Sequence, residues 1–215
     1  MNTISMLLSD NQTANDKLIK RVLNQLHSAC IGIVTAVNLD EQTLEAIPAT
    51  KIKVLNKNFE ESDENLPLIV DIPFVFPKSG GYSITMPIKE GDECLLIFTD
   101  ADFSAWWQNG GVQSPQTAFK HHLSNAVAIV GISSLKTAVS NYNPNAIEIR
   151  NADASEKISL SAGNITLKSA TITLDGNVTT TGTSNLQRTT TIQGKEFLAH
   201  AHSNGNEGAN TGGVV

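Results

Sequence analysis

Residues 158–183 read ISLSAGNITLKSATITLDGNVTTTGT, and this stretch decides the fold of the C-terminal part of the chain. Large apolar residues occur in pairs two positions apart, and successive pairs begin seven and then six residues apart: Ile158/Leu160, Ile165/Leu167, Ile172/Leu174 and, more weakly, Val178/Thr180. Side chains alternate between the two faces of a strand, so each pair points to one side while Ser, Thr and Lys point to the other. The Ile- and Thr-rich runs with intervening Gly-Asn pairs favour short strands over a helix.

One chain alone cannot bury these apolar pairs, because an isolated narrow ribbon is not stable in water. A solenoid folded from one chain normally needs about twenty residues per turn and at least three turns, so roughly forty residues are too few. Three identical chains around a three-fold axis would each contribute Ile and Leu residues to one shared core and would leave no exposed strand edge. We therefore expect residues 146–196 to form an intertwined, trimeric triple-stranded β-helix.

A His-x-His motif, His200-Ala201-His202, follows the repeat and has the same two-residue spacing. On a three-fold axis both histidines of each chain would face inward, so three chains would offer six imidazole nitrogens. Six nitrogen ligands suit an octahedral first-row metal such as iron, whereas zinc favours four ligands. The pattern predicts a structural metal ion at an apex formed by residues 197–215. The alternative is two exposed histidines in a Gly- and Asn-rich tail.

The preceding residues differ in character from the repeat. An amphipathic helix is predicted within residues 1–28, since its apolar residues recur at helical spacing: Leu18, Ile19, Val22, Leu23 and Leu26. Residues 29–135 contain about five strand-like runs without helices between them, which indicates a small closed barrel of OB type. Residues 136–145 are polar and are predicted to be a linker. The fold class is therefore all-β with one N-terminal helix.

Composition and charge argue against several classes of function. The net charge is -6, so the chain has no basic surface for nucleic acid or anionic lipid. No signal-peptide pattern and no apolar run near the ~20 residues of a spanning helix occur, so we expect synthesis in the cytoplasm. No Ser-His-Asp set, carboxylate pair or phosphate-binding loop stands out, so we expect that the protein is not an enzyme.

Two further pairs of residues allow more than one interpretation. Cys30 and Cys94 each lie in an apolar run without a metal-ligand neighbour, which favours buried free thiols, while a disulfide between them stays open. Trp106 and Trp107 could form an aromatic platform for bases or sugars. Alternatively, one Trp packs in the core and the other covers a barrel end or a subunit contact.

The chain resembles the central baseplate spike, or membrane-puncturing needle, of contractile-tailed bacteriophages. The segments that carry this resemblance are IGIVTAVN (31–38), MPIKEGDECLLIF (86–98), DFSAWWQNGG (102–111), KHHLSNAVAIVGI (120–132) and KEFLAHAHSNG (195–205). The resemblance implies an OB domain that binds the tail hub, a trimeric needle that pierces the host outer membrane as the sheath contracts, and an apex. At that apex, His200 and His202 of three chains would bind one iron ion.

The resemblance also implies a place and partners for the chain. It would be a virion structural protein at the tip of the tail baseplate, made in the host cytoplasm, with partners among baseplate proteins and no nucleic acid. The ending departs from the family pattern, since a Gly- and Asn-rich tail closes on Val214-Val215. The second hypothesis is a tail-fibre-like receptor or glycan-binding module that uses the Trp pair or the tail.

Overall fold

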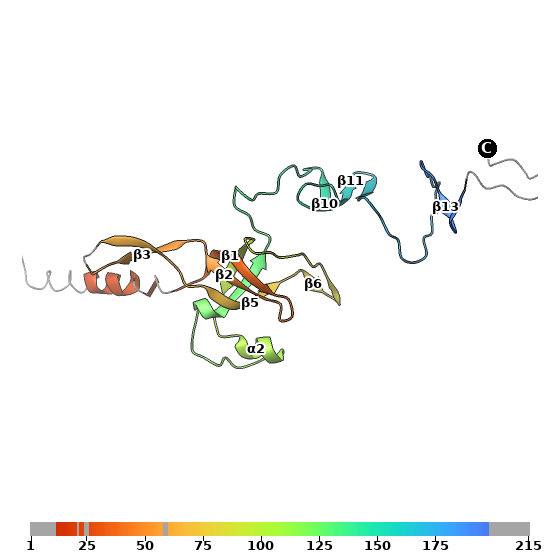
Figure 1. Cartoon of the computed structure of the whole chain (residues 1–215). Coiled ribbons are helices and arrows are strands. Elements are labelled where there is room, and N and C mark those ends of the chain that lie inside the picture. The colour runs from red at the N-terminus through yellow and green to blue at the C-terminus, as the bar shows by residue number, and fades with distance from the viewer. Residues whose placement is uncertain (1–11, 21, 24–25, 58–59, 198–215) are drawn as a thin grey trace, which may run out of the picture. The chain divides into compact units, whose positions relative to one another are not determined.

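The computed structural model describes residues 12–20, 22–23, 26–57 and 60–197 (Figure 1). The chain divides into two compact units, Met1–Asn141 and Tyr142–Val215, and the division lies inside the segment predicted as a linker. Residues 12–20 and 22–23 are helical, as the spacing predicts. The described apolar residues of this helix are exposed: Leu18, Ile19, Val22 and Leu23.

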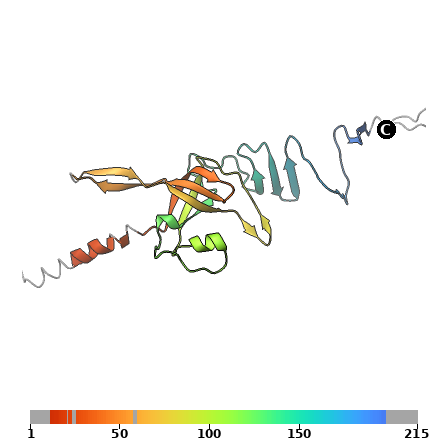
Figure 2. The ribbon, with the colours of Figure 1, turned by 60° about the horizontal axis from the view of Figure 1, so that its bottom comes forward.

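Five strands of the first unit close into a barrel (Figures 1 and 2). They are β1 (Ala29–Asn38), β2 (Thr43–Pro48), β5 (Ile69–Val75), β8 (Glu93–Phe98) and β9 (Ala126–Val130), and their order around the barrel is β1-β2-β5-β9-β8. The β5–β9 pair is parallel, and the other pairs are antiparallel. This five-stranded closed barrel is OB-like, so the mostly-β fold class and the barrel are confirmed.

The barrel buries its own core. Eleven apolar residues fill it: Val34, Leu44, Ala46, Ile69, Ile72, Phe74, Cys94, Leu96, Phe98, Ala126 and Ala128. Cys30 and Cys94 are free thiols, because Cys30 pairs with Leu96 and Cys94 with Gly32, which places the two cysteines diagonally rather than opposite each other. Burial, together with the neighbouring Cys30, raises the pKa of Cys94 to about 11.

Several short elements of the first unit lie outside the barrel order. They are β3 (Lys51–Leu55) paired with β4 (Glu61–Asn65), β6 (Lys78–Ser79) paired with β7 (Tyr82–Ser83), helix α2 (Ser104–Asn109) and the 3-10 turn η1 (Leu123–Asn125). The strand-like run over residues 42–56 is divided between β2 and β3 and does not form one continuous strand. The barrel strand ends at Pro48, where the Ala49 N–H still donates to the Ile31 carbonyl oxygen at 2.8 Å, and the chain then bends before β3 starts a separate ribbon.

The second unit contains a three-stranded antiparallel sheet, β10 (Ala146–Arg150), β11 (Lys157–Ser161) and β12 (Asn164–Lys168), visible side by side in Figure 2. A small hairpin of β13 (Thr191–Ile192) and β14 (Lys195–Glu196) follows. The strands predicted at the first two Ile-x-Leu pairs are therefore present. Residues 169–190 form no strand in the single chain, and the β10–β12 ladders join strands of one chain, so this structure does not show the predicted intertwining.

Candidate functional site

The sheet of the second unit places its large apolar residues in register on one face. Two rows cross the three strands, Ile147–Leu160–Ile165 and Ile149–Ile158–Leu167. We call these six residues the apolar sheet face. Their exposed fractions in the single chain range from 42% for Ile158 to 72% for Ile147. Six contiguous aliphatic side chains at this exposure mark a surface that binds another surface.

The opposite face of the same sheet holds charged groups that already have partners. Lys157 Nζ donates to Glu148 Oε1 at 2.8 Å, and Arg150 Nη1 lies 3.9 Å from Glu148 Oε2. The Glu148 and Arg150 side chains are only 7% and 8% exposed. The hydrogen bond from Lys157, followed by that from the Asn143 backbone N–H, lowers the pKa of Glu148. The sheet thus covers its charges and exposes its aliphatic side chains, the reverse of a sheet that works alone in water.

The long connection between β8 and β9 carries both tryptophans on α2. Trp106 is 51% exposed and Trp107 is 38% exposed, and no residue of α2 is buried. The interpretation that one Trp packs in the core is therefore wrong, because α2 belongs to a loop outside the barrel wall. Phe103 contacts Trp106 edge to face, with ring centroids 6.3 Å apart. The two indoles form an exposed aromatic surface.

Asp102 holds this aromatic loop in place. Its Oδ1 accepts a hydrogen bond from the Ser104 N–H at 2.9 Å, and its Oδ2 accepts from the N–H groups of Gln116 and Thr117 at 3.1 and 2.8 Å. These contacts connect residues at both ends of the loop through one carboxylate. Hydrogen bonds from Ser104 and, to a smaller extent, from Thr117 lower the pKa of Asp102 to about 2.

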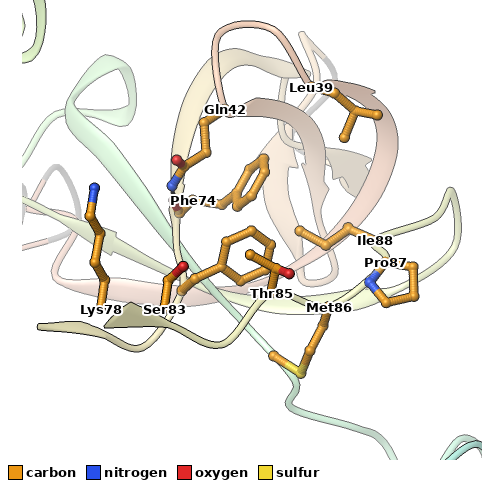
Figure 3. Close-up of a pocket in the computed structure, with 10 residues that line it drawn as sticks. Leu39, Gln42, Phe74, Lys78, Ser83, Thr85, Met86, Pro87 and Ile88 are labelled. Carbon is orange, nitrogen blue, oxygen red and sulfur yellow. Dashed lines mark hydrogen bonds between the residues drawn. The ribbon is translucent and has the colours of Figure 1, made fainter. Parts of the chain in front are cut away.

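A hollow of about 520 Å³ lies beside the end of β5 (Figure 3). The β1–β2 turn contributes Leu39 and Gln42 to it, and residues 83–88 form another wall. Gln42 Nε2 donates to the Phe74 carbonyl oxygen at 2.7 Å, which ties the turn to β5. Lys78 is the one charged residue among the described residues of its lining, and the remaining lining is apolar or neutral.

The predicted metal ligands, His200 and His202, lie outside the described residues. Within the described part of the chain, no group of three or more His, Cys, Asp or Glu residues is placed to hold a metal ion. A search of the same residues also finds no helix long and apolar enough to span a membrane. The metal prediction therefore stays a prediction.

Residues 32–131 match the family model of the phage protein Gp138 N-terminal domain. This match begins in β1 and ends directly after β9, so it covers the barrel and its connections. The match supports a phage structural protein. It is also consistent with a component of the virion. The comparison with curated proteins finds no match.

The loop geometry predicts a local effect of Asp102→Ala. We expect the variant to change the Trp fluorescence of the full chain and to speed proteolysis within residues 104–118, while the far-ultraviolet circular dichroism of the barrel is retained. Asp100→Ala is the matched control, because Asp100 is 79% exposed and has only long ion-pair contacts with Lys120 and His121. Equal protection of the loop in wild type and Asp102→Ala would contradict the anchoring role.

The same carboxylate gives the loop a pH dependence. The pKa of Asp102 is depressed from its ordinary 3.8 to about 2, so its stabilising effect is complete above about pH 4 and is lost as the pH falls toward 2. The wild-type Trp emission should therefore change in that window, and the change should be absent from Asp102→Ala.

Proposed function

We propose that this chain is the homotrimeric spike of a phage tail baseplate and pierces the host outer membrane during tail contraction. The observation that carries the proposal is the apolar sheet face, which one chain leaves uncovered. The match of the barrel to a phage protein domain supports the part of the proposal that makes the chain a phage structural protein. A barrel that closes on itself and a sheet that cannot bury its own aliphatic face together suit a chain whose second unit requires copies of itself.

In the proposed trimer each chain contributes one β10–β12 sheet to a three-sided prism. The Ile147 and Ile149 rows face the axis, and the covered Glu148 ion pairs lie on the face of the sheet away from the axis. Three copies bring eighteen large aliphatic side chains into one core, and each fully buried side chain contributes roughly 1.5–3 kcal/mol before ordering costs. The edge strands β10 and β12 of neighbouring chains can then pair, which removes the exposed edges.

Residues 169–190 have a separate part in this proposal. They continue the Ile-x-Leu pattern with Ile172 and Leu174, which are 49% and 63% exposed, yet they form no strand in the single chain. We infer that they become strands by pairing with the other two chains, so that intertwining begins where pairing within one chain ends. Because these strands would be paired only between chains, one chain could not leave the trimer without breaking their backbone hydrogen bonds.

His200 and His202 of the three chains are proposed to bind one iron ion at the apex. The donor set supports this, because six neutral imidazole nitrogens fill an octahedral sphere and leave no position for water or substrate. The ion would be structural. It would join the ends of three chains and resist fraying under load.

A spike of this kind acts through shape and stiffness, and it requires no catalytic turnover. A Ser- and Thr-rich exterior gives lipid no apolar anchor, which suits passage through a membrane. The barrel is proposed to attach the spike to the tail hub or neighbouring baseplate proteins, after synthesis in the host cytoplasm.

The assembly through the apolar sheet face is tested by two neighbouring substitutions on β12. Leu167→Lys places a charge on the apolar face, whereas Thr166→Lys places the same charge on the opposite face. We expect Leu167→Lys to convert trimer to monomer at micromolar concentration in sedimentation equilibrium, because three buried ammonium groups would meet near the axis. Thr166→Lys should keep the wild-type mass. Equal behaviour of the two variants would contradict the proposal.

Metal analysis of the purified full chain tests the apex. We expect one iron per three chains in wild type and almost none in the His200→Ala/His202→Ala double variant, with a lower thermal midpoint of the trimer and an intact barrel. His122→Ala, which removes an exposed histidine of the barrel unit, should retain the iron. If the purified wild-type protein contains no bound metal, the proposed iron site at His200 and His202 is wrong.

A glycan-binding module is the second candidate, and the exposure of both Trp106 and Trp107 favours it. Aromatic rings on a carboxylate-anchored loop suit stacking against sugar rings. The two functions differ in whether the apolar sheet face is buried between chains. The spike requires that burial, and a glycan-binding module does not.

A further inference from the structure

The outside of the barrel carries an apolar surface that the proposed function does not use. One row crosses four strands, because Ile31 of β1 pairs with Leu95 of β8, Leu95 with Ile129 of β9, and Ile129 with Val75 of β5. Ile33 and Ile97 flank this row on β1 and β8. We call these six residues the outer band.

The outer band is partly open to solvent in the single chain. Five of its members are 37–44% exposed: Ile31, Ile33, Val75, Ile97 and Ile129. Their side chains point away from the core, since their neighbours along each strand, such as Val34, Leu96 and Ala128, are fully buried. A barrel exterior with large aliphatic side chains on four adjacent strands is unusual for a surface that remains in water.

The chemistry of the outer band restricts what can cover it. β1, β8 and β9 carry one charged residue, Glu93, and no Lys or Arg, so the band lacks the basic residues that attract an anionic lipid surface. These strands are paired on both sides in the closed barrel, so an extended peptide cannot add to them as a further strand. A face of aliphatic, mostly β-branched side chains fits best against another such face.

Area supports a second copy of this chain as the occupant. The six residues of the apolar sheet face are 42–72% exposed, and five residues of the outer band are 37–44% exposed. A stable interface buries ~800 Å² per partner, and covering the outer band as well as the sheet face buries more of each chain than covering the sheet face alone. The barrel continues into the sheet through residues 131–145, so a trimer formed by the sheets holds three outer bands at high effective concentration.

We propose that the barrels of the trimer pack against one another through the outer band, so that the spike has a second interface between its copies. The inference rests on the proposed trimer. It assigns Ile31, Leu95 and Ile129 to the centre of that interface, and it leaves the aromatic loop and the Figure 3 hollow available to other partners.

Thiol labelling of the full chain tests this assignment. Ile129→Cys places a thiol in the outer band, and Val70→Cys places one on β5 outside it, at a residue that is 53% exposed compared with 38% for Ile129. A water-soluble maleimide would then be applied to the assembled protein, with wild type measuring the background from Cys30 and Cys94. The exposure in one chain predicts less than a two-fold difference in labelling rate between the two variants. A covered band predicts that the Ile129→Cys variant is labelled at least tenfold more slowly than the Val70→Cys variant.

A third variant identifies the source of the cover. Leu167→Lys, combined with Ile129→Cys, should restore fast labelling as the trimer dissociates. If the wild-type protein is a trimer and the Ile129→Cys variant is still labelled as fast as the Val70→Cys variant, the outer band is free for a lipid or a different protein, and the inference is overturned while the proposed function stands. Protection that persists in dissociated protein also overturns it, because the cover would then come from the same chain. A monomeric wild type overturns the proposed function itself.

Discussion

Burial of the apolar sheet face is the constraint on which the second half of the chain depends. Pairing of β10, β11 and β12 satisfies the backbone and brings six aliphatic side chains into two rows, yet the same pairing leaves those rows in water. Nothing within the described residues of this unit covers them, while Glu148, Lys157 and Arg150 are paired on the other face. The hydrophobic effect can be satisfied only if the face meets another face.

The two units solve the burial problem in different ways. The barrel closes, so Val34, Leu44, Leu96 and their neighbours form a core within one chain, and its strands have no free edge. The sheet of the second unit has three strands of five residues each and is too small to do so. A phage structural protein with both parts can fold its barrel first and complete the second unit only on assembly. In the proposed trimer, stiffness would follow from strands and a core that no single chain possesses.

Much of this organisation could be predicted from residue patterns, and the misses have physical causes. The Ile158/Leu160 and Ile165/Leu167 pairs predict strands because apolar residues that alternate with Ser and Thr match the two-residue period of a strand. β4 could not be found in the same way, since all five of its residues are polar and exposed and only its pairing with β3 makes it a strand. Helix α2 is six residues long and buries nothing, so it has no apolar periodicity to detect. The pairing of β10, β11 and β12 within one chain differs from the predicted intertwining, because the repeat locates strands and buried faces but does not determine the hydrogen-bond partner of each strand.

The mass of the full-length wild-type protein in solution tests the central claim most directly. Light scattering coupled to size exclusion, at micromolar concentration and physiological salt, should give three times the 23.0 kDa mass of one chain. A monomeric mass under these conditions would mean that water faces the two aliphatic rows in the native state, and it would contradict the account.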